Sequence, residues 1–206
     1  MLEKDWVKKF YVDLGGHGFD HVERVHAMSL KIAKDEKADL DVIDAASWLH
    51  DIARAKESSG EVNCHAEEGS KMAELILKEI GYSDEKISKI KYAIEVHRFS
   101  KNKKAETIEA QILQDADRLD SIGAVAISRT FMQCGLKKIP LHDPNKKPNL
   151  DNNKEDSTAI NHFNEKILKL KPETFHTPLA KELAKERYKF VELFLQKFKE
   201  EWDGNS

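Results

Sequence analysis

Apolar residues recur at every third or fourth position through most of the chain, the spacing that places them on one face of an α-helix. The first such stripe consists of Val22, Val25, Met28 and Ile32, and it follows a glycine-rich segment at 15–18. No hairpin signal appears anywhere along the chain. The pattern therefore predicts an all-α fold.

Capping residues, glycines and prolines set the ends of the predicted helices. Gly81 supplies a C-terminal stop, and Pro178 suits the first turn of the last helix. The N-cap candidates are Asp20, Asp39 or Asp41, Asn63 and Ser83. The predicted helices cover residues 20–34, 39–51, 63–80, 83–97, 107–131, 159–170 and 177–202. The polar segment 54–61 is predicted to be a loop.

The helical pattern stops between residues 137 and 157, where three prolines and several Asn and Asp residues occur. Loops of this length are uncommon in compact domains and often serve as lids. The length of 206 residues fits one domain. We therefore predict a single domain over 1–206, with a helical core at about 17–130, a long loop at 137–157 and C-terminal helices at 158–203.

Composition narrows the choice of partner and compartment. The net charge is −3, so no overall positive field favours a nucleic-acid duplex. No stretch approaches 18 apolar residues, and the N-terminus lacks the apolar segment of a signal peptide. Cys64 and Cys134 do not form a disulfide framework. These features predict a cytoplasmic protein without a membrane partner.

Four polar residues fall on or near the apolar faces of three predicted helices. His21 shares a face with Val25, His50 and Asp51 end an apolar run, and Asp117 belongs to an inward stripe. Two adjacent buried polar groups cost several kcal/mol unless something pairs with them. An ordinary hydrogen-bonded pair would explain His50 and Asp51 alone, but a helical bundle can also gather all four residues around one metal ion.

Two imidazoles and two carboxylates would leave open positions on a six-coordinate ion. This mixed ligand set suits Mn²⁺, Fe²⁺, Co²⁺, Ni²⁺ or Mg²⁺, and it is also compatible with Zn²⁺. A metal with open positions acidifies a bound water and polarises a phosphoryl oxygen. The pattern therefore predicts one divalent ion at a hydrolytic site.

Other histidines and several arginines are further candidates for the site. His65 and His97 lie at the ends of predicted helices. They could bind a second ion, or they could hydrogen-bond a phosphate and protonate the leaving oxygen. The alternative is that both are ordinary helix-end histidines. The histidines predicted to be surface or loop residues are His17, His26, His142, His162 and His176.

The arginines divide between phosphate contacts and structural pairs. Arg54 suits a phosphate contact because its guanidinium matches phosphate oxygens in a fork. Arg24 and Arg98 are further phosphate candidates, against the alternative of a solvated helix face. For Arg118 we favour an ion pair with a neighbouring acid over substrate binding.

The ordered set His21, His50-Asp51 and Asp117 resembles the signature of the HD superfamily of metal-dependent phosphohydrolases. The segments 19–25, 114–124 (QDADRLDSIGA) and 175–177 are similar to its small YedJ/YpgQ-like bacterial branch. The resemblance implies an HD-type helical bundle with a C-terminal helical extension, and those four residues as metal ligands. Some family variants hold two metals, and His65 and His97 fall in the right order for the added ligands.

Two activities of the superfamily do not fit this chain. The type that hydrolyses guanosine tetraphosphate needs acids where Arg54 and Ala55 stand, and the cyclic-nucleotide phosphodiesterase pattern is also missing. The resembled branch implies nucleoside triphosphate pyrophosphohydrolysis.

We therefore predict a phosphohydrolase acting on a nucleotide or related phosphate ester. The alternatives are a non-catalytic nucleotide-binding module and an O₂-dependent di-iron enzyme. A homodimer is also considered, because the last helix carries a row of apolar residues, which are Phe190, Val191, Phe194, Leu195 and Phe198.

Overall fold

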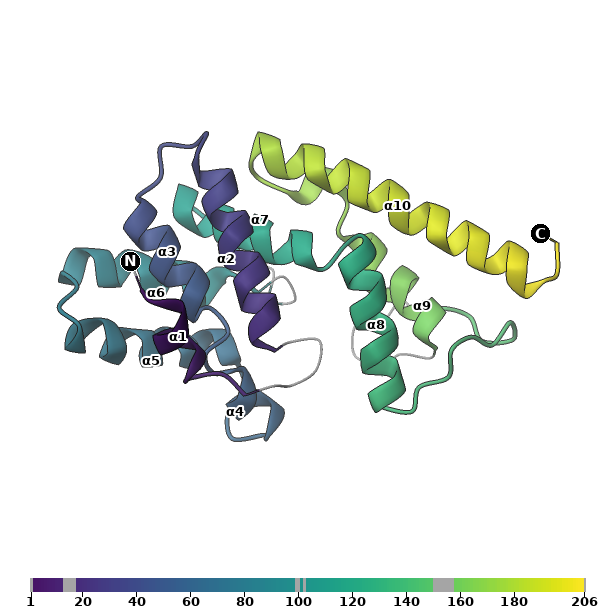
Figure 1. The fold of residues 1–206 in the computed structure, drawn as a ribbon, viewed down its shortest axis with the longest axis horizontal. Helices are drawn as coiled ribbons and strands as arrows, with labels where there is room; N and C mark the ends of the chain where they lie inside the picture. The colour runs from purple at the N-terminus through teal and green to yellow at the C-terminus, as the bar shows by residue number, and fades with distance from the viewer. Residues whose placement is uncertain (1, 13–17, 99–100, 102, 150–157, 206) are drawn as a thin grey trace. The chain divides into compact units, whose positions relative to one another are not determined.

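The computed structural model describes residues 2–12, 18–98, 101, 103–149 and 158–205, and all regular structure in them is helical (Figure 1). The predicted all-α fold is confirmed. The helices of the first half are α1 (Lys4–Lys8), α2 (Phe19–Ala33), α3 (Leu40–Leu49), α4 (Arg54–Ser58), α5 (His65–Glu79) and α6 (Asp84–Val96). Those that follow are α7 (Ile108–Asp120), α8 (Ala124–Leu136), α9 (Ala159–Glu165), η2 (Ile167–Lys169), η3 (Pro172–Thr174) and α10 (Pro178–Trp202).

The chain divides into two compact units, Met1–Asp117 and Arg118–Ser206. The first is built around α3, which packs against both α2 and α6, while α5 packs against α6 (Figure 1). Every residue from Val42 to His50 is buried. A helix that is buried on all sides presents its C-terminal end inside the unit, and that end carries the His50-Asp51 pair.

Several predicted helix ends are confirmed by capping contacts. The Asp39 carboxylate accepts hydrogen bonds from the amides of Asp41 and Val42, and the Ser83 hydroxyl accepts one from the amide of Lys86. Gly81 has φ +82°, the left-handed conformation that ends a helix. The α10 helix begins at Pro178 and ends at Trp202, as predicted.

Other boundaries were predicted wrongly, chiefly where short helices meet turns. Residues 54–58 form α4 rather than a loop, and α1 was not expected at all. Gly18, not Asp20, is the N-cap of α2, and Cys64, not Asn63, precedes α5. The helix predicted over 107–131 is broken at Gly123, whose φ of +88° separates α7 from α8. The helix predicted over 159–170 likewise divides, into α9 and η2.

The second unit has an aromatic core made by three of its helices. The rings of Phe131, Phe163 and Phe194 lie 5.8 to 5.9 Å apart, which joins α8, α9 and α10. The described part of the predicted loop, 137–149, contains no helix and is tied to α9, because the amide of Ala159 donates to the carbonyl of Pro140 (2.9 Å). Residues 150–157 of that prediction lie outside the described residues.

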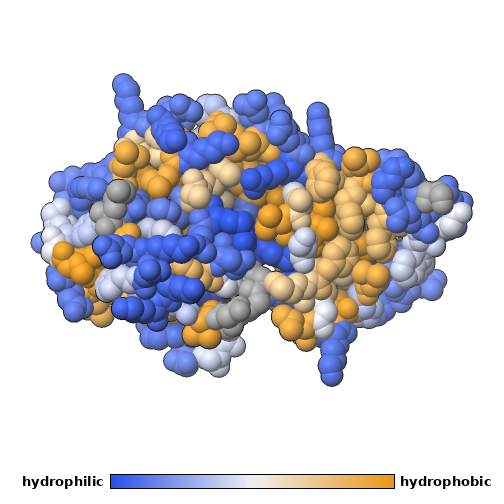
Figure 2. Space-filling model, in the orientation of Figure 1, coloured by the Kyte–Doolittle hydropathy of each residue, from blue (hydrophilic) through white to orange (hydrophobic). Residues whose placement is uncertain are grey.

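Part of the apolar row on α10 is covered and part is not. Val191 and Leu195 are buried in the second unit, whereas Phe190 is 49% exposed. Figure 2 shows further apolar surface over α8, whose exposed side chains include Met132 and Leu136. The homodimer stays a prediction. In the described ranges, no helix combines the length and apolarity that crossing a membrane requires.

Candidate metal centre

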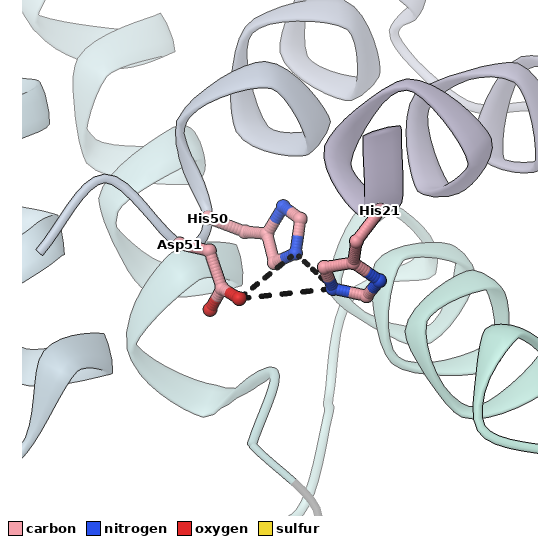
Figure 3. A group of neighbouring side chains, drawn as sticks. All are labelled: His21, His50 and Asp51. Atoms are coloured by element: carbon pink, nitrogen blue, oxygen red, sulfur yellow. Dashed lines mark hydrogen bonds and ion pairs between the residues drawn. The ribbon is translucent and has the colours of Figure 1, made fainter. Parts of the chain in front are cut away.

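Three buried side chains from α2 and the end of α3 point toward one another (Figure 3). His21 lies in the first turn of α2, His50 caps the C-terminus of α3, and Asp51 follows it. The Nε2 atoms of His21 and His50 are 3.4 Å apart, and they lie 3.7 and 3.9 Å from the Oδ2 atom of Asp51. These three donor atoms are close enough together to hold one metal ion.

The predicted fourth member, Asp117, reaches the same place from the last turns of α7. Its Oδ1 atom lies 3.4 Å from the Nε2 atom of His21. Its side chain is 18% exposed, whereas those of His21, His50 and Asp51 are at most 1% exposed. The four residues predicted from sequence therefore come together, with Asp117 on the side that solvent reaches.

The other oxygen of Asp51 faces a second pair of histidines. Its Oδ1 atom lies 3.2 Å from Nε2 of His65, the first residue of α5, and 3.6 Å from Nε2 of His97, the C-cap of α6. This second group, Asp51, His65 and His97, is also compact enough to hold a metal ion. Asp51 thus stands between two histidine pairs, one for each carboxylate oxygen.

The ring nitrogens that face Asp51 are set by hydrogen bonds on the far side of each ring. Nδ1 of His50 donates to the carbonyl of Ser47 (2.8 Å), and Nδ1 of His97 donates to the carbonyl of Ile94 (2.6 Å). A carbonyl only accepts, so the proton of the neutral ring is on Nδ1 and Nε2 carries a lone pair. His65 follows the same scheme, with Nδ1 bonded to the carboxylate of Glu57.

These residues fit a divalent cation. Although Nε2 of His65 is buried near Asp51, it makes no hydrogen bond with any described residue. Imidazole lone pairs aimed at carboxylate oxygens repel one another unless a cation lies between them. Histidine ligands in metal sites use the same arrangement, with the second ring nitrogen bonded to a carbonyl or a carboxylate.

The electrostatics favour neutral imidazoles beside charged carboxylates. Burial lowers the pKa of His50 to about 4, and burial lowers the pKa of His65 to about 4 as well. Burial opposes ionisation of Asp51, but Arg54 and His50 hold its pKa well below the usual value. For Asp117, His21 overcomes the same penalty and keeps the pKa low. At neutral pH His50 and His65 are therefore neutral beside two charged carboxylates, which suits a cation.

The arginines proposed as phosphate contacts or ion-pair partners all interact with carboxylates or backbone carbonyl groups. Arg54 donates to both oxygens of Asp51 at 2.9 to 3.0 Å, and Arg98 donates to Glu57 at 2.5 Å. Arg24 pairs with Asp20 on the surface of α2. Arg118 donates to the carbonyl of Thr174 within the second unit. Their predicted roles toward a substrate stay predictions.

One histidine was misjudged from the sequence, and one residue of the site was missed. His26, predicted to be a surface or loop residue, lies in α2 and is mostly buried: its ring stacks on Trp48 at 3.9 Å, and its Nε2 atom lies 3.0 Å from the carboxylate of Asp44. The sequence does not point to Glu57, because α4 has only five residues and is too short to show a helical period. His17 lies outside the described residues.

Comparison with known proteins gives a consistent result. The sequence model of the HD domain family matches residues 18–122. The protein YpgQ of Bacillus subtilis (strain 168) is 30% identical over 206 residues, covering 98% of this chain and 92% of that protein.

Solved structures of similar proteins cover almost the whole chain. An HD-superfamily hydrolase from Bacillus thuringiensis has a TM-score of 0.76 at 32% identity, covering 97% of this chain and 94% of that one. The structure of Bacillus subtilis YpgQ in complex with ADP has a TM-score of 0.72 at 28% identity, covering 99% of this chain and 100% of that one.

Proposed function

Since the chain belongs to the HD domain family, we propose that it is a metal-dependent phosphohydrolase with His21, His50, Asp51 and Asp117 as metal ligands. The observation that carries the proposal is the convergence of these four side chains, which are up to 96 residues apart in sequence. The donor atoms of His21, His50 and Asp51 lie 3.4 to 3.9 Å from one another, and Asp117 lies 3.4 Å from His21. A divalent ion, when bound there, acidifies a water molecule and polarises a phosphoryl oxygen.

The carboxylates and the imidazoles would have different roles in binding the metal ion. Asp51 and Asp117 supply negative charge, and the neutral imidazoles add affinity without cancelling it. Asp117 is the partly exposed member of the four, so water and substrate would enter on its side. The fixed rings of His65 and His97 direct lone pairs inward, which favours their use as ligands of a second ion over proton donation to a leaving group.

The proposed substrate is a nucleotide or a related phosphate ester. The similarity to YpgQ, whose structure was solved with ADP, supports a nucleotide, and nucleoside triphosphate pyrophosphohydrolysis is the reaction we propose first. Arg24 is our candidate phosphate contact, because it follows His21 by about one helical turn and its partner Asp20 is exposed at the surface of α2. Arg54 and Arg98 already donate to Asp51 and Glu57, so a phosphate would either take the remaining N–H groups of each guanidinium or displace the carboxylate.

The test is turnover of a panel of nucleoside mono-, di- and triphosphates with Mn²⁺, measured as released phosphate or pyrophosphate. We expect pyrophosphate from a triphosphate, and loss of at least about 100-fold in rate for Asp117→Asn. Asp41→Asn, an exposed acid on α3, is the matched control. Absence of release with every divalent metal would contradict the proposal, and tight nucleotide binding without turnover would indicate a non-catalytic module.

The carboxylate of Asp51 belongs to both groups of candidate ligands, so the di-iron alternative can also be tested. Two ion positions on either side of one carboxylate would suit a pair of irons as well as a pair of Mn²⁺ ions. Two irons per purified chain together with O₂ consumption would favour that function over hydrolysis.

A further inference from the structure

The short helix α4 places two charged side chains one turn apart, and both face the metal cluster. Arg54 holds the carboxylate of Asp51 in a fork. Glu57, three residues later, accepts a hydrogen bond from Nδ1 of His65 through its Oε2 atom. The two side chains also approach each other, with Nη1 of Arg54 3.9 Å from Oε2 of Glu57.

The second oxygen of Glu57 has a partner of its own. Nη1 of Arg98 donates to Oε1 at 2.5 Å, and Arg98 directly follows His97 in the chain. One carboxylate therefore joins α4 to the first residue of α5 and to the segment after α6. His65 is fully buried, while the Glu57 side chain is 21% exposed, so the contact lies at the outer edge of the histidine group.

We propose that Glu57 is the positioning residue that makes His65 a metal ligand, and that Arg98 fixes Glu57 in turn. This inference rests on the proposed metal centre. A carboxylate on the far nitrogen of a ligating histidine fixes its tautomer and ring orientation and raises its basicity. Glu57 thereby strengthens the Asp51, His65 and His97 group directly, while it acts on the His21 and His50 side of Asp51 only through Arg54.

A titration with Mn²⁺, read by calorimetry and by metal content after gel filtration, tests the proposal. Wild-type protein is expected to bind two ions of different affinity. Glu57→Leu should weaken the second ion about 10- to 100-fold and the first by much less. Glu57→Gln should fall between, because the amide oxygen still accepts from Nδ1 but carries no charge. Glu61→Gln is the matched control, since this exposed acid bonds to Ser59 outside the site.

The nitrogen spectrum of the histidine rings in metal-free protein gives a second readout. His65 should show the tautomer with its proton on Nδ1 in wild type and Glu57→Gln, and a mixture in Glu57→Leu. Thermal unfolding of each variant reports whether it folds, and Glu57→Gln preserves the test if Glu57→Leu does not.

The outcomes separate this inference from the proposed function. Unchanged binding of both ions and an unchanged His65 tautomer in Glu57→Leu would overturn the role of Glu57 and leave the proposed function standing. Failure of wild-type protein to bind any Mn²⁺ would overturn the proposed metal centre. In that case the ring spectrum would still decide whether Glu57 orients His65.

Discussion

Asp51 is the residue on which the candidate site depends most. Its carboxylate is 1% exposed, faces four histidine rings and accepts a forked pair of hydrogen bonds from Arg54. A buried charge is tolerated only when it is paired and hydrogen-bonded. Arg54 therefore has a structural task in addition to any contact it makes with substrate.

Replacement of Arg54 tests that task. Arg54→Ala leaves the buried Asp51 carboxylate without its forked hydrogen bonds. Allowing for the partial exposure of the guanidinium to solvent, we expect the metal-free protein to lose about 2 kcal/mol or more of unfolding free energy. Arg24→Ala removes an exposed pair and should cost less than about 1 kcal/mol. Urea unfolding with a chelator present measures both, and equal losses would contradict the assignment.

The buried histidines make stability depend on pH. The pKa of His50 and of His65 is about 4 in the folded protein, against a usual value near 6.5, so between these pH values the unfolded chain binds more protons. Stability should therefore fall as pH drops from 6.5 toward 4, by up to about 1.4 kcal/mol per pH unit for each ring.

Asp51 and Asp117 have lowered pKa values and add a loss only below about pH 4, where the unfolded carboxyl groups protonate. Urea unfolding of metal-free protein at pH 7.5, 6 and 5 isolates the histidine effect. A free energy of unfolding that stays constant over this range would show that the rings bind protons equally well in the folded and unfolded states, and would contradict the lowered pKa values.

At the scale of elements, the turn between α7 and α8 depends on a glycine. Gly123 has φ +88° and ψ −161°, a conformation that is essentially restricted to glycine, and a Cβ atom there would lie 3.0 to 3.3 Å from the Arg187 side chain. Arg187 itself donates to the carbonyl of Leu119 at the end of α7 (2.5 Å). The Arg187 side chain therefore packs closely against the turn at Gly123.

Two glycine substitutions in the second unit should have opposite effects. Gly123→Ala should destabilise the protein by about 1–3 kcal/mol, because both the backbone and the contact with Arg187 are unfavourable. Gly135→Ala, inside α8 with no atom within 4 Å of the new methyl group, should stabilise it by about 0.5–1 kcal/mol. Thermal unfolding compares them, and a destabilised Gly135→Ala would count against the helix assignment.

At the scale of the molecule, all six clustered residues belong to the unit Met1–Asp117 and to the matched residues 18–122. The second unit, Arg118–Ser206, lies almost entirely outside the family match. The candidate metal centre is therefore complete within the first unit. The prediction of one domain over 1–206 stays a prediction.

Metal binding should stabilise the fold, because the ligands come from segments that separate on unfolding. At 100 times its dissociation constant, Mn²⁺ adds about 2.7 kcal/mol to the unfolding free energy. For a chain of this length we expect the Tm to rise by about 5–10 °C and to return on chelation. Asp117→Asn should lose most of this shift and Asp41→Asn should keep it. A Tm that does not respond to any divalent metal would argue against the site.

The amino-acid sequence by itself determined the helical class and the order of the four candidate ligands. Both follow from local rules, because helical periodicity and the position of His21, His50, Asp51 and Asp117 on apolar faces are properties of short segments. Local rules failed at 54–61, where a five-residue helix has too few positions to show a period, and at Gly123, which breaks the helix predicted over 107–131.

Only the tertiary structure decided how the site is built. Asp51 meets a different histidine pair with each oxygen, Arg54 is bonded to that carboxylate, and Glu57 holds His65. These contacts join side chains that lie on different helices, so they depend on how α2, α3, α5 and α6 pack. The orientation of each ring depends in turn on which acceptor the packed helices leave beside Nδ1, and no spacing in the sequence encodes that.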